Sequence, residues 1–119
     1  MEDLRLFDDE YRLMDIVWEQ EPVNSTELCH LCAQRLGWKK STTYTMLRKL
    51  AGRGLLRNEE ATVSALVGRA QVRQRESQAV LERTFDGSLP AFVAAFLQDK
   101  TLTADEARAL KHMIEEATK

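Results

Sequence analysis

The order of hydrophobic patterns along the chain limits its possible folds strongly. Three segments with helical spacing come first, and after Gly54 the pattern changes to short β-branched and apolar runs. Only two prolines and five glycines interrupt the 119 residues. Because these residue types are the main breakers of helices, most of the chain is expected to be helical. The sequence therefore predicts a mainly α protein with one short β-hairpin.

Capping residues predict where the first three helices begin and end. The expected N-caps are, in chain order, Asp8 or Asp9, Asn24 and Ser41. The residues expected to stop the same helices are Pro22, Gly37 and Gly54. The second helix is expected from Ser25 to about Leu36, and the third is expected to end near Arg53.

A two-stranded ribbon is expected to follow the third helix. Leu55–Arg57 and Thr62–Val67 are apolar or β-branched, and the polar stretch Asn58–Glu60 between them predicts a turn. Three helices followed by such a ribbon are typical of a winged helix-turn-helix. Residues 1–68 are therefore predicted to form a winged-helix DNA-binding domain.

The remaining residues, 69–119, are expected to form a helical dimerisation region. Helical spacing runs from Arg69 to Phe85 and from Leu89 to Gln98, and Thr103 with Glu106 predicts a capping box for a last helix. These helices carry more apolar surface than a small isolated pair can cover. The residues expected at the dimer interface are Val80, Phe85, Leu89, Phe92, Val93, Phe96, Leu97, Leu110, Met113 and Ile114. A ligand pocket within the phenylalanine-rich part is the alternative interpretation.

Positive charge is concentrated in one window of an otherwise acidic chain. The chain has 17 Lys and Arg against 19 Asp and Glu, yet Leu28–Asn58 contains no acidic residue. This window includes the third helix of the predicted winged helix, which is where a DNA-binding protein needs positive charge. The alternative is an ordinary solvated helix face.

The third helix supplies the candidate DNA contacts. Short polar and cationic side chains read base edges in the major groove, and Lys and Arg hold phosphates. Ser41, Thr42, Thr45, Arg48 and Lys49 share one helix face, and Lys39, Lys40, Arg53 and Arg57 are expected to hold phosphates. Tyr44 lies at the border of this face, either packed on the core or in contact with DNA.

No catalytic site, metal site or cofactor is predicted. Cys29, His30 and Cys32 have a spacing that superficially resembles a metal site, but His30 points elsewhere on a helix and the only other histidine is His112. The two cysteines are expected to pack as small buried residues; a thiol sensor is the alternative. The acidic start Met1-Glu2-Asp3 is unlike a signal peptide, and no apolar run is long enough to span a membrane. Because the two cysteines lie too close together on a helix to staple the fold, a reducing cytoplasm is expected.

Several segments resemble the penicillinase and methicillin-resistance repressors and their copper-responsive relatives (BlaI/MecI/CopY type). Glu10–Trp18 is similar to the first helix of that family, and Ser41–Leu50 followed by Arg53-Gly54-Leu55 resembles its DNA-reading helix. Phe85-Asp86-Gly87-Ser88 and Phe92–Phe96 resemble its dimerisation region, and these two segments are the more specific ones.

The resemblance implies a homodimeric repressor that binds a palindromic operator in double-stranded DNA. It also implies a membrane-bound sensor metalloprotease that cleaves the repressor at a bond matching Ala95–Phe96. Known members often carry Asn where this chain has Ala95. Copper-responsive members end in a cysteine cluster, whereas no cysteine follows Cys32 here, which disfavours release by a metal.

The wing also departs from the family, because it holds no Lys or Arg between Arg57 and Arg69 and carries Glu59 and Glu60. We therefore expect the wing to contribute little to phosphate binding. Two other functions stay open on the sequence alone: a winged-helix module that binds protein, and a regulator gated by a ligand or by thiol oxidation.

Overall fold

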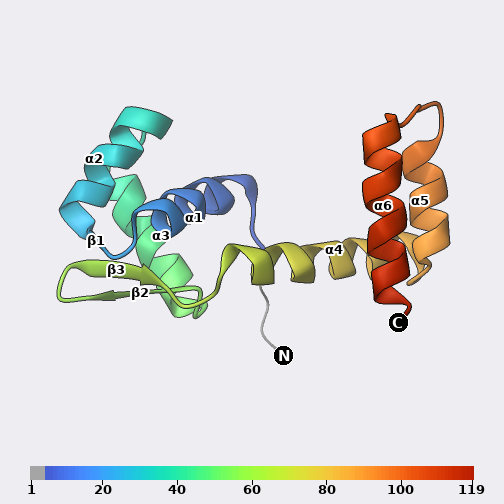
Figure 1. Cartoon of the computed structure of the whole chain (residues 1–119). Helices are drawn as coiled ribbons and strands as arrows, with labels where there is room; N and C mark the ends of the chain where they lie inside the picture. The colour runs from blue at the N-terminus through green and yellow to red at the C-terminus, as the bar shows by residue number, and fades with distance from the viewer. Residues whose placement is uncertain (1–4) are drawn as a thin grey trace. The chain divides into compact units, whose positions relative to one another are not determined.

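The computed structural model describes residues 5–119, so Met1-Glu2-Asp3 lies outside the described residues. Figure 1 shows the elements in chain order. They are α1 (Asp8–Gln20), β1 (Val23–Asn24), α2 (Ser25–Leu36), α3 (Lys40–Gly52), β2 (Leu56–Glu59), β3 (Thr62–Ala65), α4 (Arg69–Phe85), α5 (Leu89–Leu97) and α6 (Ala104–Ala117). The predicted order of three helices, a hairpin and three further helices is confirmed. The chain divides into two compact units, Met1–Ala79 and Val80–Lys119.

The first unit has a winged-helix fold, and its core lies between the first three helices and the sheet. Each helix contributes one apolar stripe to this core. The fully buried side chains include Leu13, Met14 and Val17 of α1, Leu28 and Cys32 of α2, Leu47 and Leu50 of α3, and Leu56 and Val63 of the strands. Leu31 and Leu36 of α2 are partly buried and pack against this core. Burial of such side chains stabilises the fold by about 1.5–3 kcal/mol each.

The start of α2 is as predicted, but two other predicted N-caps are wrong. Asn24 Oδ1 accepts a hydrogen bond from the amide of Thr26 at 2.8 Å, and Gly37 ends the helix with φ +70°. The N-cap of α1 is Phe7 instead of Asp8 or Asp9, because Glu10 Oε1 accepts the Phe7 amide at 2.8 Å and so lets the helix begin one residue earlier.

The third helix also begins earlier than predicted. Its N-cap is Lys39 and its first helical residue is Lys40, so Ser41 lies inside the first turn instead of capping it. No side chain caps this terminus. The hydroxyl of Ser41 is consequently presented on the helix surface, where the row of exposed residues begins.

The wing is part of a three-stranded antiparallel sheet in the order β1-β3-β2. The sequence pattern did not indicate β1, a strand of two residues in which Val23 pairs with Val63. The predicted hairpin turn was also too early, since Asn58 and Glu59 belong to β2 and pair with Val63 and Thr62. The turn is instead Glu60-Ala61, whose φ angles of 51° and 61° are those of a type I′ hairpin turn. The backbone twist of a type I′ turn matches the right-handed twist of the flanking strands.

The second unit comprises the end of α4 with α5 and α6. Thr103 and Glu106 form the predicted capping box of α6, with hydrogen bonds of 3.0 and 3.1 Å between side chains and backbone amides. Leu110, Met113 and Ile114, which the sequence predicts at a dimer interface, are exposed in the single chain. No described helix is both long enough and apolar enough to cross a membrane.

Candidate nucleic-acid interface

Helix α3 has one buried face and one exposed face. Thr43, Leu47 and Leu50 are at most 1% exposed and fix the helix on the core. The five residues predicted to face DNA are all exposed: Ser41, Thr42, Thr45, Arg48 and Lys49. Because the spacing of Thr43, Leu47 and Leu50 places them on one side of the helix, their burial leaves the polar side outward. The sequence pattern predicted this division correctly.

The exposed face begins at a positively charged helix end. Lys39 and Lys40 are exposed there, and the first turn of α3 contains no acidic residue. The helix dipole adds partial positive charge at the same end. Along the face, Arg48 Nη2 donates to Thr45 Oγ1 at 3.4 Å. The arrangement has the charge and hydroxyl groups that phosphate and base-edge contacts require.

Tyr44 lies at the border between the two faces, as its position in the sequence predicted. The side chain is half-buried and packs against the core, and its hydroxyl lies 3.4 Å from Ser25 Oγ of α2. The ammonium of Lys40 lies 5.9 Å from the centre of its ring. Tyr44 therefore joins α3 to α2 while its ring stays close to the charged end of α3.

A carboxylate that the sequence pattern did not single out is buried at the other end of α3. Glu10 is 1% exposed, and its Oε2 lies 2.9 Å from Arg53 Nη1 and 3.5 Å from Lys49 Nζ. We call Phe7, Glu10, Lys49 and Arg53 the Glu10 cluster. A signal was present in the sequence, because Glu10 occupies the apolar stripe of α1, three and four residues before Leu13 and Met14.

The Glu10 cluster favours the charged form of its carboxyl group. Burial alone raises the pKa of Glu10, but the hydrogen bond from the Phe7 amide and the charge of Arg53 outweigh it, so the pKa lies below its ordinary value. Arg53, predicted to hold a phosphate, thus lies against a carboxylate of its own domain. It also donates to the carbonyl of Arg5.

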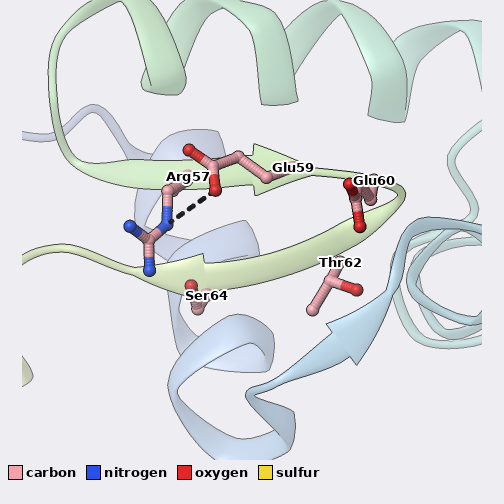
Figure 2. Close-up of a pocket in the computed structure, with 5 residues that line it drawn as sticks. All are labelled: Arg57, Glu59, Glu60, Thr62 and Ser64. Carbon is pink, nitrogen blue, oxygen red and sulfur yellow. Dashed lines mark ion pairs between the residues drawn. The ribbon is translucent and has the colours of Figure 1, made fainter.

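The wing presents mixed charge, as Figure 2 shows. Arg57 and Glu59 project from β2 beside their cross-strand partners Ser64 and Thr62 on β3, and Glu60 stands at the turn. These five residues line a shallow hollow. Arg57 Nε lies 3.8 Å from Glu59 Oε2, and both side chains are exposed. The predicted phosphate contact Arg57 is therefore partly neutralised by its neighbour.

One further cation of the basic window is also paired. Arg35 donates to both oxygens of Glu19 at 3.0 Å, which ties the end of α2 to α1. The bidentate pair is exposed. Arg35 is therefore held by a carboxylate of its own domain.

Both cysteines lie inside the first unit. Cys32 is fully buried, Cys29 is 5% exposed, and neither is in a disulfide. Burial raises the pKa of Cys32. Since the thiolate is the reactive form, this environment opposes a role as a redox sensor. Among residues 5–119 no group of three or more His, Cys, Asp or Glu side chains is arranged to hold a metal ion.

The residues predicted for dimerisation fall into two groups. Phe85 and Phe92 are half-buried and pack edge to face, with ring centres 5.3 Å apart. Val80 and Leu97 are also half-buried. The others are exposed in the single chain: Leu89, Val93, Phe96, Leu110, Met113 and Ile114. An isolated soluble monomer rarely exposes so many large apolar side chains in one small unit.

The residues matched to the cleavage bond, Ala95 and Phe96, lie in the last turn of α5, and both are exposed in the single chain. Phe96 stacks on Phe92 with 6.2 Å between ring centres, and the ammonium of Lys100 lies 4.2 Å from the centre of its ring. The bond is thus part of a regular helix.

Two known proteins are similar to this chain in sequence. The chain is 23% identical over 116 residues to the penicillinase repressor of Bacillus licheniformis, covering 94% of this chain and 91% of that protein. It is 25% identical over 109 residues to an uncharacterized 16.5 kDa protein in the ptsI 3′ region of Latilactobacillus sakei, covering 88% and 75% of the two chains.

A solved structure shares its fold with 60% of this chain. It is the solution structure of the monomeric form of Bacillus licheniformis BlaI in complex with the blaP half-operator. The TM-score is 0.51 at 21% identity, and the match covers 60% of this chain and 93% of that one. The sequence profile described as penicillinase repressor matches residues 7–116. The chain belongs to the penicillinase repressor family, whose members are transcriptional repressors and not enzymes.

Proposed function

We propose that this DNA-binding transcriptional repressor acts as a cytoplasmic homodimer on a palindromic operator. The observation that carries the proposal is the division of α3 into a buried apolar face and an exposed face of hydroxyl and cationic side chains. In winged-helix proteins this third helix lies in the major groove. The similar BlaI structure was solved in complex with a half-operator, which supports DNA binding by a protein of this fold.

Each side chain of the interface has a proposed role. Ser41, Thr42, Thr45 and Arg48 face the bases and nearby phosphates, because they form the exposed side of α3. Lys39, Lys40 and Lys49 hold phosphates at the two ends of this side, and Tyr44 packs beside Lys40. Arg57 contributes a weaker phosphate contact, since Glu59 lies 3.8 Å away.

The second unit supplies the proposed dimer interface. Its exposed apolar side chains would be covered by the same surface of a second copy, as a two-fold interface requires. Two linked monomers bind two half-sites with a gain in effective concentration that a monomer lacks. The half-sites should lie about 34 Å apart, one turn of DNA, or a multiple of that distance.

Release from DNA is proposed to follow loss of the dimer. Cleavage at Ala95–Phe96 by a membrane-bound sensor metalloprotease would divide the second unit and remove the linkage between half-sites. Because this bond lies within α5, the protease would act on a locally unwound helix. The Ala95 side chain is smaller than the Asn common at this position, so a matching protease needs a different specificity.

The test of the DNA-binding role is a measurement of affinity against salt concentration. Arg48→Ala with Lys49→Ala should weaken binding to duplex DNA and lower the slope of log affinity against log salt. The control is Arg12→Ala with Arg73→Ala, which removes two exposed cations outside the proposed face. Equal binding by both variants would refute the assignment of α3.

The palindrome is tested separately by selecting bound duplexes from a random pool. Enrichment of an inverted repeat with half-sites about one helical turn apart would support the dimer on DNA. Enrichment of a single half-site, or of no sequence, would contradict it. Failure of the wild-type protein to bind any duplex would instead favour a winged-helix module that binds protein through its acidic wing.

A further inference from the structure

The Glu10 cluster places two cations of the third helix in different environments. Both cations approach the same oxygen, Oε2 of Glu10, with Arg53 Nη1 at 2.9 Å and Lys49 Nζ at 3.5 Å. The other oxygen, Oε1, accepts the amide of Phe7 at 2.8 Å. The carboxylate is 1% exposed, whereas the Arg53 side chain is 24% exposed and that of Lys49 is 51% exposed.

Arg53 is directed into its own domain. Its guanidinium is paired with Glu10 and also donates to the carbonyl of Arg5, so it joins the end of α3 to the segment around the start of α1. Turning this side chain toward a DNA phosphate would leave the buried Glu10 carboxylate with the Phe7 amide and with Lys49, whose ammonium lies 3.5 Å away. Uncovering a buried charge in this way is strongly unfavourable.

The Lys49 side chain is 51% exposed, and its ammonium lies against two neighbours in its own domain. Its ammonium lies 5.7 Å from the centre of the Phe7 ring and 3.5 Å from Glu10 Oε2. A lysine side chain has four rotatable bonds and loses conformational entropy when it binds a phosphate. A lysine that is already ordered loses less of it, so pre-ordering strengthens binding.

We propose that Glu10 is a positioning residue of the DNA-binding face: it keeps Arg53 within the domain, away from phosphate, and it orders Lys49 for a phosphate contact. This inference rests on the proposed role of α3 in DNA binding. It changes the role of Arg53, which the sequence alone assigned to a phosphate, from a contact to a support. The proposed role also explains why a carboxylate is buried at position 10, where packing alone would not require a charge.

The experiment uses the full-length protein and a mixed-sequence duplex of about two helical turns, since non-specific binding reports phosphate contacts directly. The main variant is Glu10→Gln with Arg53→Gln, called the glutamine pair below. It removes one charge of each sign and nearly preserves the size of both side chains. We expect it to keep the wild-type salt slope, because Arg53 contacts no phosphate. We expect its affinity to fall about threefold, because Lys49 is no longer ordered.

Lys49→Ala supplies the matched comparison. Its slope should be lower than that of the wild type by about 0.9 for each phosphate that Lys49 would otherwise neutralise. In the Lys49→Ala background, the glutamine pair should cause no further decrease in affinity, because Glu10 acts through Lys49. A purely structural role of Glu10 would give the same decrease in both backgrounds.

Three outcomes would overturn the inference. The first is a slope for the glutamine pair that falls by about 0.9 per protomer, since Arg53 would then contact a phosphate. The second is an equal decrease in affinity with and without Lys49. The third is a wild-type protein that does not bind the duplex, which would also refute the proposed function. The first two outcomes leave DNA binding by α3 intact, and the third does not. Failure of this inference can therefore be distinguished from failure of the proposed function.

Thermal unfolding of each variant shows whether the fold is retained. If the glutamine pair does not fold, Glu10→Gln alone provides the test, because it keeps an oxygen to accept the Phe7 amide and removes the negative charge that is paired with Arg53. A salt slope steeper than that of the wild type then supports retention of Arg53 by Glu10. An unchanged slope overturns it.

Discussion

Arg53 Nη1 lies 2.9 Å from Oε2 of Glu10 and so links the C-cap of α3 to the first turn of α1. Because the carboxylate is buried while the guanidinium reaches the surface, the pair orients the last turn of α3 relative to the rest of the domain. The same pair makes the stability of the first unit dependent on pH.

Glu10→Gln is expected to lower the free energy of unfolding at neutral pH by roughly 2 kcal/mol, the value of a hydrogen bond to a charged group. The folded pKa of Glu10 lies below its ordinary value of 4.5, so this contribution is complete above about pH 5 and is lost as the pH falls below 4.5. Urea unfolding of both proteins from pH 7 to about pH 3.5 measures the difference. A difference that stays constant over this range would contradict the ionised state of Glu10.

The hairpin turn of the wing is expected to be improved by residues that tolerate positive φ. Glu60 and Ala61 have φ of 51° and 61°, where a Cβ atom costs about 1–2 kcal/mol. Glu60→Asn with Ala61→Gly should raise the free energy of unfolding by about 1 kcal/mol, as measured in urea. Gly54→Ala, at φ +78°, is the reverse control and should destabilise the protein through its backbone, since the added Cβ meets no atom within 4 Å. A stabilised Gly54→Ala protein would contradict this explanation.

Removing the acidic charge of the wing is expected to strengthen DNA binding. A carboxylate about 10 Å from a phosphate in water opposes binding by roughly 0.4 kcal/mol, or about twofold. Glu59→Gln with Glu60→Gln should therefore raise the affinity for duplex DNA about fourfold at low salt, and the gain should vanish as salt screens it. Glu82→Gln with Glu115→Gln, which removes two exposed carboxylates of the second unit, is the control. If both variants gained the same affinity for DNA, the effect would come from the net charge of the protein and not from the position of the wing.

A charge on the apolar side of α6 is expected to dissociate the proposed dimer. Met113 is 62% exposed in the single chain, so Met113→Asp should leave the monomer folded. In a dimer the new carboxylate would be buried, and the dissociation constant should rise by about 30-fold, equivalent to roughly 2 kcal/mol. Sedimentation measures the change, with His112→Asp on the polar side of the same helix as the control. An unchanged association would place the interface elsewhere.

The two cysteines are expected to be unreactive in the folded protein. Cys32 is fully buried and its pKa is raised by burial, so little thiolate is present at neutral pH. Thiol titration should proceed only as fast as the protein unfolds, and Cys29→Ser should bind DNA like the wild type under reducing and oxidising conditions. Rapid labelling of the folded protein, or loss of DNA binding on oxidation, would restore the thiol-sensor alternative.

Local rules in the sequence were sufficient for the order of the elements and for the exposed face of α3. Asn24, Gly37 and Thr103 act through bonds to backbone groups within a few residues, so their effects are visible without a fold. The period of Thr43, Leu47 and Leu50 likewise fixes which side of α3 is buried. The same reasoning did not reveal contacts between residues that are far apart in the sequence, such as Arg53 with Glu10.

The tertiary structure alone decided how the charges are paired. Arg53 and Glu10 are 43 residues apart, so no local pattern shows that they meet, and charge counting treats Arg53 like Arg48. The two-residue strand β1 also exists only because β3 lies beside it, and no run of two residues is a signal by itself. The sequence determined which helix face carries positive charge, because helical period is local; the fold decided which of those cations is already bound by the protein, because ion pairs depend on distance in space.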